Sequence, residues 1–391
     1  MTDPSRIAQD RPLQILISAG ETSGDIHAAR LVHALRSRTG AEFFGMGGPH
    51  MRDAGVETIV DSREVAVLGL AETITHIPAV LRALRRLEGE ARLRKPHLAI
   101  LVDSWGVHVR LAKRLKKQGI RLVYFISPQV WAWRKGRVRT IRGIFEKVLV
   151  IFPFEQAFYE REGVAAEFVG NPLVEEVRAT KSRAEFGLAH GLNASAPIIT
   201  LLPGSRRSEL RYHVPVLAAA IQELAADENL QFVVAAAPGM RNELELLRVT
   251  AAAVIVVENE TYNALAAADC SVVASGTATV EAALLDAPCV VIYRLSWVTA
   301  EVVRRLMKTP YVAMINVIAG RLVAPELIQE NFTVAKVVAE VRRLLDDPNA
   351  RAQMISGLRE VRARLGSAGA IERAADAIVT MLARNAPALP S

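Results

Sequence analysis

The chain has 391 residues, a length that favours two domains over a single hydrophobic core. Hydrophobic residues make up 51% of it and aromatic residues only 5%, so we expect a core of Ala, Val, Leu and Ile between helices and parallel strands. The sequence has no apolar run of about 18 residues and its polar start lacks a signal-peptide core, which argues against a membrane-spanning helix and predicts a cytoplasmic protein.

The formal net charge of +7 indicates an anionic partner, such as a phosphorylated substrate, an anionic lipid or a nucleic acid. The two cysteines, Cys270 and Cys289, lie in apolar stretches and show neither a disulfide framework nor the spacing of zinc ligands. We therefore expect a reducing compartment and no metal site.

Apolar runs in the first half predict most of a parallel sheet of about seven strands, namely 13–19, 42–46, 98–102, 121–126, 147–151 and 167–169. The first run is followed by Gly20-Glu21-Thr22-Ser23-Gly24-Asp25, and a helical pattern then runs from Ile26 to Arg38. Its two glycines permit a close backbone approach to a ligand, and its polar side chains favour a ligand-facing loop over a plain strand-to-helix turn. The glycine-rich stretch 45–49 lacks the spacing of a dinucleotide fingerprint, so we predict a flexible loop there.

Asp103 directly follows the predicted strand 98–102. Ligands bind beyond the carboxyl ends of strands in parallel α/β sheets, so this carboxylate is a candidate general base. The alternative is that Asp103 only caps the helix predicted over 107–117. The residues by themselves do not choose between the two.

Two basic stretches of the first half have two interpretations each. The helix over 81–95 places leucines on one side and arginines on the other, which predicts either a solvated face over a core stripe or, with the apolar stretch 67–80, a surface for an anionic membrane. Trp131 and Trp133 precede a run of arginines and a lysine, which suits either a stacking surface for nucleic acid or the wall of a pocket.

Gly170-Asn171-Pro172 predicts a hinge between a first domain, 1–172, and a second domain, 173–365. We expect a C-terminal helix at about 366–385 to pack back on the first domain. The strands predicted in the second domain are 198–202, 231–237, 252–257, 271–274 and 289–293. Both halves are thus predicted to be Rossmann-like, doubly wound α/β domains that face each other across a cleft.

Two strand–helix junctions of the second half predict a site for a nucleoside diphosphate. The first strand ends at Pro203-Gly204-Ser205-Arg206, where Ser205 is expected to cap the next helix. A helix start offers unpaired N–H groups and a partial positive charge to a phosphate, and Arg206 adds a planar cation. In Ser275–Glu281 the junction recurs without a basic residue, and Glu281 is placed to accept hydrogen bonds from ribose hydroxyls.

These blocks resemble, in order, those of the lipid-A-disaccharide synthase family, over about residues 13 to 350. The blocks that carry the resemblance are Gly20–Asp25, Ser127–Trp133, Leu202–Arg206, Ser275–Glu281, Lys308–Val312 and Pro325–Gln329. Two segments depart from the family. Ser104-Trp105-Gly106-Val107-His108 stands where the family usually has Pro, Asp or Glu, Phe and Asn, and Gly170-Asn171-Pro172 stands where it often has Gly-His-Pro.

The resemblance implies an inverting hexosyltransferase of the GT-B fold that uses neither metal nor cofactor. It would join UDP-2,3-diacylglucosamine to 2,3-diacylglucosamine 1-phosphate, with UDP and the β-1,6 disaccharide 1-phosphate as products. Asp103 falls where the family has its proposed base. The implied UDP-binding residues are Gly204, Ser205, Arg206, Ser275, Gly276, Thr277, Ala278, Thr279, Glu281 and Asn316. The implied acceptor-side loop contains Gly20, Glu21, Ser23, Gly24 and Asp25.

The resemblance further implies a peripheral position on the inner face of the cytoplasmic membrane, no nucleic-acid partner, and room for a homodimer. The alternative is a GT-B transferase or a UDP-sugar epimerase that acts on a different, water-soluble substrate. An epimerase would need further acid–base side chains, and no convincing set stands out. The missing Gly-x-Gly-x-x-Gly argues against a dehydrogenase, and the lack of a known RNA-binding motif argues against an RNA-binding module.

Overall fold

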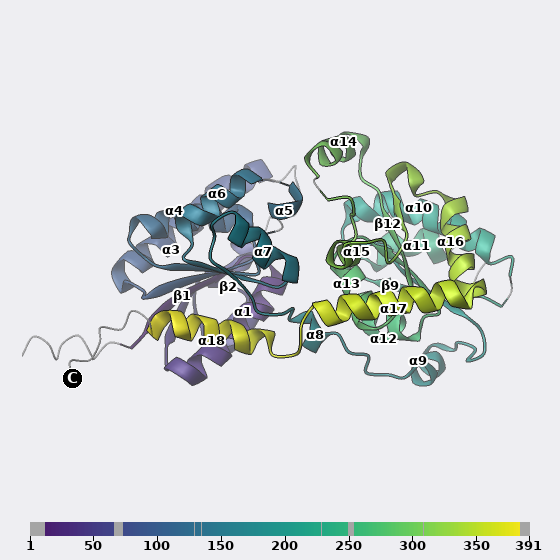
Figure 1. Ribbon diagram of the computed structural model, residues 1–391, viewed down its shortest axis with the longest axis horizontal. Coiled ribbons are helices and arrows are strands. Elements are labelled where there is room, and N and C mark those ends of the chain that lie inside the picture. The colour runs from purple at the N-terminus through teal and green to yellow at the C-terminus, as the bar shows by residue number, and fades with distance from the viewer. Residues whose placement is uncertain are drawn as a thin grey trace, which may run out of the picture. The chain divides into compact units, whose positions relative to one another are not determined.

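A computed structural model describes residues 12–65, 73–128, 130–133, 135–227, 229–248, 254–307 and 309–383. The chain divides into two units, each an α/β domain built on its own parallel sheet (Figure 1). Unit 1 comprises Met1–Pro172 and Gly366–Ser391, and unit 2 comprises Leu173–Leu365. The predicted fold class, with two doubly wound Rossmann-like sheets, is confirmed.

Unit 1 alternates strands and helices along the chain. Its elements are β1 (Gln14–Ala19), α1 (Thr22–Thr39), β2 (Glu42–Gly47), α2 (Pro49–Asp53), β3 (Glu57–Asp61), α3 (Thr73–Arg94), β4 (Leu98–Val102), α4 (Trp105–Lys117), β5 (Leu122–Phe125), α5 (Val130–Trp133), α6 (Lys135–Ile144), β6 (Lys147–Val150), α7 (Pro153–Arg161), β7 (Ala166–Phe168) and α18 (Ala370–Ala383). The sheet has the order β3-β2-β1-β4-β5-β6-β7, and its pairs are parallel.

Helices cover both faces of this sheet, which explains why its central strands are apolar throughout. Ile15 and Ile17 of β1 belong to a core shared with α1, α2 and α18. Leu16, which points to the opposite face, belongs to a core shared with α3, α4, α6 and α7. Each strand therefore contributes alternate side chains to two separate hydrophobic cores.

The C-terminal helix α18 packs on α1, far from it in the sequence (Figure 1). Ile371, Ala374 and Ile378 of α18 are buried in the core with α1. Arg38 of α1 pairs with Glu372 and Asp376 at the edge of this contact. Apolar burial, rather than the exposed ion pairs, accounts for most of the attachment.

Unit 2 repeats the architecture. Its elements are α8 (Leu173–Glu176), α9 (Arg183–His190), β8 (Ile198–Leu202), α10 (Arg207–Leu224), β9 (Gln231–Ala236), α11 (Glu245–Arg248), β10 (Val254–Glu258), α12 (Thr261–Ala267), β11 (Cys270–Ala274), α13 (Thr277–Leu284), β12 (Cys289–Tyr293), α14 (Trp297–Leu306), α15 (Met314–Ala319), β13 (Glu326–Ile328), α16 (Val334–Asp346) and α17 (Pro348–Arg364). The order of the sheet is β10-β9-β8-β11-β12-β13, again with parallel pairs.

The prediction of a flexible loop over 45–49 was wrong. Gly45 and Met46 pair with Ile17 and Ser18 of β1, so the glycines continue β2. The next helix, α2, begins at once at Pro49, because the buried carboxylate of Asp25 accepts hydrogen bonds at its N-terminus.

In the part of the chain that the structure describes, no helix combines the length and the apolar character that crossing a membrane requires.

Candidate functional site

Each sheet has one place where the order of its strands reverses. In unit 1 the chain moves from β1 outward to β3 and then returns to β4 on the other side of β1; in unit 2 it does the same at β8 and β11. Ligands of such sheets bind at this switch point, beyond the carboxyl ends of the strands. The segments that follow β1 and β4 contain Gly20–Asp25 and Asp103, and those that follow β8 and β11 contain Pro203–Arg206 and Ser275–Glu281. The predicted site segments thus lie in pairs at the two switch points.

Asp103 occupies a strained turn at the end of β4. Its φ is +53°, and that of Ser104 is +50°, a left-handed conformation that aspartate tolerates but that is unfavourable for serine. Its backbone carbonyl accepts hydrogen bonds from His108 Nδ1 at 2.6 Å and from the Tyr124 hydroxyl at 2.8 Å. The helix α4 begins at Trp105 with Ser104 at its N-cap and no capping side chain, so the alternative that Asp103 caps this helix was wrong.

The surroundings of Asp103 make its carboxylate a stronger base than an exposed aspartate. Burial raises the pKa of Asp103, although the hydrogen bond from the Ser104 backbone and the neighbouring His27 act in the opposite direction. A carboxylate with a raised pKa binds a proton more readily, which is the property that a general base requires.

The loop Gly20–Asp25 approaches Asp103 closely but is shorter than predicted. A Cβ added to Gly20 would lie 2.9 Å from Ser104 Oγ, so only glycine fits there without a shift. A Cβ on Gly24 would lie 3.9 Å from the Cβ of Asp103. The helix α1 already begins at Thr22, so Ser23, Gly24 and Asp25 form its first turn rather than a loop.

The polar residues of this segment differ in their surroundings. Glu21 and Ser23 are exposed beside the turn. Asp25 is buried, and its carboxylate accepts hydrogen bonds from the backbone N–H groups of Gly48 at 2.6 Å, His50 at 3.0 Å and Met51 at 3.2 Å. The structure therefore gives Asp25 a role in holding α2, whereas the exposed Glu21 and Ser23 are accessible to a bound ligand.

Ser127 and Trp131 of the block Ser127–Trp133 are hydrogen-bonded to a carboxylate that the sequence did not single out. Glu155, at the start of α7, is buried and accepts hydrogen bonds from Trp131 Nε1 at 3.1 Å and from Ser127 Oγ at 3.3 Å. Burial raises the pKa of Glu155 to about 8, against the effect of these hydrogen bonds. The Trp131 indole also packs edge-on against Phe154. It is thus fixed in place, while the Trp133 side chain lies outside the described residues.

In unit 2 the turn after β8 is organised by Glu209. Gly204 has a φ of +126°, which favours glycine. Glu209 accepts hydrogen bonds from the Ser205 N–H at 3.1 Å and from Arg206 Nη1 at 3.0 Å. Arg206 itself stands at the N-cap of α10, so the expectation that Ser205 caps this helix was wrong. With 73% of its side chain exposed, Arg206 remains accessible to an anion.

The neighbouring turn after β11 leaves a helix start uncapped by any side chain. Gly276 is the N-cap of α13, and Thr277 is exposed. The hydroxyls of Ser275 and Thr279 are used inside the protein, since Ser275 donates to the Val312 carbonyl at 3.3 Å and Thr279 to the Gly276 carbonyl at 2.8 Å. A phosphate here would meet the backbone N–H groups of the first turn.

Glu281 of α13 lies close to two residues that sequence patterns did not connect with it. Burial, and secondly the charge of Glu176, raise the pKa of Glu281 to about 7. Burial and the same two carboxylates raise the pKa of Tyr262 to about 12. Glu176 stands in the short α8 after the hinge and Tyr262 stands in α12, so only folding brings the three side chains together.

If Glu281 binds the ribose of UDP, as the resemblance implies, UDP affinity should fall as the pH is lowered from 8 to 6, because its pKa is raised to about 7. Only the carboxylate can accept hydrogen bonds from both ribose hydroxyls, and protonation through a pKa of about 7 removes most of it, which predicts a loss of roughly tenfold. Calorimetric titration with UDP at several pH values would measure the dependence. The Glu281→Gln variant serves as the control, because UDP phosphate ionisation contributes equally to both proteins. An identical dependence of UDP affinity on pH in the two proteins would contradict a contact between Glu281 and the ribose.

Asn316 is the predicted UDP-binding residue whose side chain is least accessible. It is fully buried, donates to the Ala324 carbonyl at 2.9 Å and Glu326 Oε1 at 2.8 Å, and accepts from the N–H groups of Val323 and Ala324 at 2.7 and 3.0 Å. Glu326 in turn accepts hydrogen bonds from the backbone N–H groups of Val312 and Ala313. Asn316 therefore uses its side chain to hold the segment next to Ser275.

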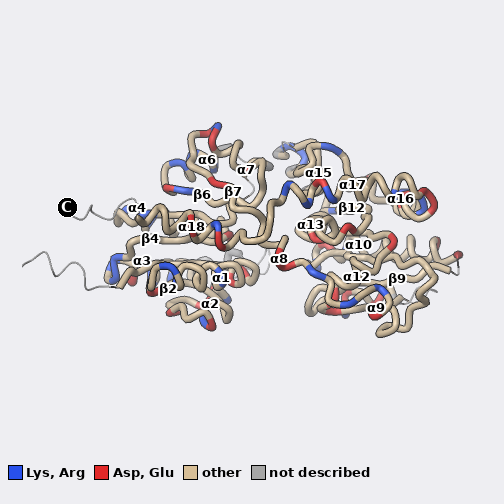
Figure 2. Tube along the Cα trace, turned by 60° about the horizontal axis from the view of Figure 1, so that its bottom comes forward, with Lys and Arg blue, Asp and Glu red and all other residues tan. Residues whose placement is uncertain are grey.

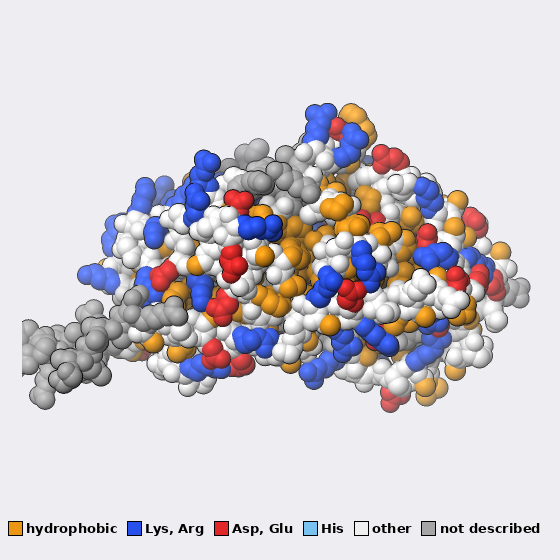
Figure 3. Space-filling view, in the orientation of Figure 1, with side chains coloured by type: hydrophobic (Ala, Val, Ile, Leu, Met, Phe, Trp, Pro, Cys, Tyr) orange, Lys and Arg blue, Asp and Glu red, His pale blue; other side chains and the backbone are white. Residues whose placement is uncertain are grey.

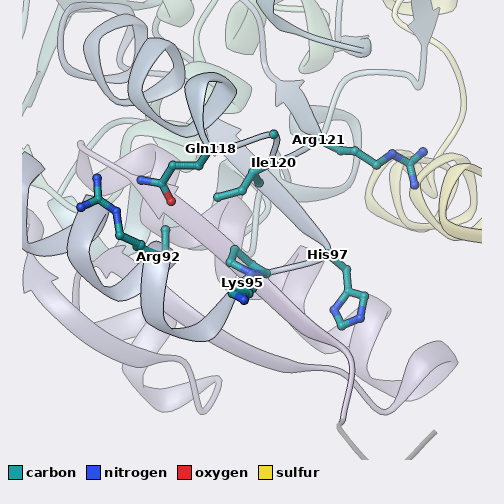
Figure 4. A pocket seen from close by; sticks show the side chains of 9 residues that line it. Arg92, Lys95, His97, Gln118, Ile120 and Arg121 are labelled. Carbon is teal, nitrogen blue, oxygen red and sulfur yellow. The ribbon is translucent and has the colours of Figure 1, made fainter. Parts of the chain in front are cut away.

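A pocket of about 450 Å³ lies at the opposite edge of the unit 1 sheet (Figure 4). Its lining includes Arg92, Lys95, His97 and Arg121, which precede β4 and β5 instead of following them. Figure 4 shows that these side chains diverge and do not converge on a common point. Arg121 is also paired with Glu146. We therefore do not assign the pocket to the site.

Among the described residues, no group of three or more His, Cys, Asp or Glu is placed to hold a metal ion.

Both the sequence and the fold of the chain are similar to those of known proteins. Residues 15–377 match the model of the family described as lipid-A-disaccharide synthetase. A lipid-A-disaccharide synthase from Myxococcus xanthus is 44% identical over 375 residues, which cover 95% of this chain and 98% of that protein.

Solved structures share the fold at low identity. A putative UDP-N-acetylglucosamine 2-epimerase from Listeria monocytogenes has a TM-score of 0.64 at 14% identity, covering 96% of this chain and 98% of its own. The glycotransferase of kitacinnamycin has a TM-score of 0.62 at 19% identity, covering 95% and 100%. At these identities the likeness concerns the fold alone.

Proposed function

The chain belongs to the lipid-A-disaccharide synthase family, and from that premise we propose how its residues divide the reaction. The protein is a glycosyltransferase of lipid A biosynthesis. It joins UDP-2,3-diacylglucosamine to 2,3-diacylglucosamine 1-phosphate, releases UDP, and forms the β-1,6-linked disaccharide 1-phosphate. The observation that carries this conclusion is 44% identity to a named synthase along nearly the whole chain.

We assign the donor to the switch point of unit 2. The UDP diphosphate meets the accessible guanidinium of Arg206 and the uncapped start of α13 at Gly276 and Thr277. Glu281 takes the ribose hydroxyls. As the glycosidic bond breaks, negative charge grows on the diphosphate, and a fixed cation and helix N–H groups stabilise that charge without rearranging.

We assign the acceptor and the base to the switch point of unit 1. Asp103 removes the proton from the acceptor 6-hydroxyl, and the oxygen attacks the anomeric carbon from the face opposite UDP, which inverts the configuration. The raised pKa of Asp103 and its position beside Gly24 and the exposed Glu21 and Ser23 support this role.

A turnover assay with the purified chain and both acylated sugars tests the proposal. Formation of disaccharide 1-phosphate and UDP is the expected result. UDP binding without any disaccharide would keep the donor site and reject the acceptor, and it would direct attention to the segment 104–108, which departs from the family. The epimerase alternative has no support beyond the shared fold.

We further propose that one helical layer of unit 1 contacts an anionic membrane surface. The helices α4 and α6 contain no acidic residue. Their exposed basic side chains are Arg110, Lys113, Lys116, Lys117, Arg139 and Arg142. Figure 2 marks Lys and Arg positions along the part labelled α6, and Figure 3 shows basic side chains gathered over the part of unit 1 where Figure 1 draws α4 and α6. Each basic residue near an anionic leaflet contributes about 1 kcal/mol, so six would hold a protein whose substrates are lipids.

The surface predicted over 67–80 and the following arginines lies partly outside the described residues. In the described part, Leu84 and Leu87 are buried in the core, which favours the interpretation of α3 as a core stripe with a solvated face. Leu93 is the exception, with 75% of it exposed.

Sedimentation with vesicles tests the membrane contact. The chain should sediment with vesicles that contain anionic lipid, sediment less as salt is added, and stay in solution with purely zwitterionic vesicles. Replacing Lys113, Lys116 and Lys117 together by Glu should abolish sedimentation while UDP affinity stays unchanged, which serves as the folding control. Equal binding of both proteins would reject this surface.

A homodimer remains a prediction from the resemblance, and sedimentation equilibrium of the free chain would test it.

A further inference from the structure

Among the residues that the structure describes, each unit has one buried histidine, and the two share a pattern of hydrogen bonds. His108 of α4 contacts the Asp103 carbonyl through Nδ1 at 2.6 Å and Ser18 Oγ through Nε2 at 2.9 Å. His213 of α10 contacts the Pro203 carbonyl through Nδ1 at 2.7 Å, and the Arg294 backbone N–H donates to its Nε2 at 2.9 Å. Both rings are fully buried.

These partners determine the form of both rings. A carbonyl oxygen only accepts, so Nδ1 carries the proton in each ring and Nε2 is the acceptor. Because the Arg294 N–H donates to Nε2 of His213, that nitrogen does not also carry a proton. In neutral His108, Nε2 accepts a hydrogen bond from the Ser18 hydroxyl. Burial lowers the pKa of His108 to about 4 and lowers that of His213, so both stay neutral at physiological pH.

The two carbonyls belong to the turns that contain the proposed site residues. Asp103 adopts the left-handed conformation itself, and Pro203 precedes Gly204, which has a φ of +126°. In each case the ring links the turn to a second strand, because Ser18 lies in β1 and Arg294 follows β12. A strained turn keeps its shape only where its surroundings hold it, and here a histidine from the following helix does so.

We propose that His108 and His213 are positioning residues for two different steps: His108 orients the Asp103 carboxylate, and His213 orients the Pro203–Arg206 segment toward the UDP diphosphate. This inference rests on the proposed function, in which Asp103 is the base and Arg206 holds the diphosphate. Neither ring touches substrate, so each acts through the backbone carbonyl that it holds.

Two substitutions at each position separate the hydrogen bond from the packing. In Asn the side-chain nitrogen occupies nearly the place of histidine Nδ1, so it still donates to the carbonyl. In Gln the terminal amide reaches the place of Nε2 instead, so the bond to the carbonyl is lost. The Asn variant should therefore preserve function and the Gln variant should not, although both place an amide in the same cavity.

For His108→Gln we expect kcat to fall roughly 30-fold, since small displacements of a catalytic group are costly, while the Kd for UDP stays within about twofold. For His213→Gln we expect the Kd for UDP to rise roughly tenfold. His108→Asn and His213→Asn should stay within about threefold of the natural protein in the same measurements. Turnover at saturating substrates and calorimetry with UDP give both quantities.

The inference is overturned if Asn and Gln variants at a position behave alike, or if both positions affect the same quantity. If a Gln variant fails to fold, Tyr124→Phe replaces the His108 arm, because it removes the second donor to the Asp103 carbonyl and should lower kcat without affecting UDP. Failure of the proposed function has a different signature: normal turnover of Asp103→Asn would remove the base itself, whereas the effect of His213 on UDP affinity does not depend on Asp103.

Discussion

Asp103→Asn is expected to lower kcat by a factor of roughly 10² to 10⁴, the range that a positioned general base contributes. Asn keeps the shape of the side chain and tolerates the left-handed φ of +53°, so the turn should survive. The affinity for UDP should remain unchanged, because Asp103 belongs to unit 1 and the proposed donor site to unit 2. Near-normal turnover of this variant would remove Asp103 as the base.

The same substitution should raise the stability of the protein. The pKa of Asp103 is higher in the folded chain than its ordinary value of 3.8, so the stability it contributes is present below that value and is lost as the pH rises through the folded pKa. Asn removes this penalty, and thermal unfolding should show a higher Tm at pH 7 and a shrinking difference as the pH is lowered.

Asp25→Asn provides a matched control in the same unit. Its carboxylate accepts three backbone hydrogen bonds at the start of α2, so this substitution should lower Tm. Changes in Tm of opposite sign for the two aspartates would separate a functional carboxylate, which lowers stability, from a structural one. Changes in Tm of the same sign would contradict the assignment of roles.

Arg206→Ala is expected to weaken UDP binding roughly 10- to 100-fold, because charge-assisted hydrogen bonds to a diphosphate contribute about 1.5–3 kcal/mol. Stability should fall as well, because the Glu209 carboxylate, only 8% exposed, loses its cation while it keeps the hydrogen bond from the Ser205 N–H. Calorimetric titration with UDP gives the affinity, and a thermal scan gives the stability.

Arg207 offers a control one residue further along the chain. Its side chain is 77% exposed and pairs with Glu243 at 3.0 Å, so it has a similar charge and exposure. Arg207→Ala should change the affinity for UDP by no more than about twofold. An equal loss in both variants would indicate a general effect of positive charge and would contradict a specific contact by Arg206.

The sequence predicted the strands that folding buries on both faces. The runs 98–102 and 198–202 are confirmed as β4 and β8, because a continuous apolar run without helical spacing has few other stable environments. The three-residue strand β13 was missed, since so short a segment has no period, and it is a strand only because β12 lies beside it. The helix start at Thr22 was missed for a similar reason, as the polar residues that suggested a loop form its first turn.

The predicted site residues show the same difference between what local sequence indicates and what tertiary neighbours decide. Order along the chain and residue chemistry singled out Asp103, Arg206 and Glu281, but not the burial and the neighbouring charges that set their properties. Asn316 and Asp25 have equally suitable side chains, yet in the structure both form hydrogen bonds with backbone groups distant in the sequence. A polar residue that binds a ligand and one that binds its own chain look alike until the partners are known.

By itself, therefore, the sequence determined the class of fold, most strands of the two sheets and the family, because these depend on apolar periodicity and on motifs that are local in the chain. Only the tertiary structure decided which carboxylates are buried, which turns are strained, and that two neutral histidines hold those turns. These properties depend on desolvation and on hydrogen bonds between elements far apart in the sequence, such as His108 with β1 and Glu176 with Glu281.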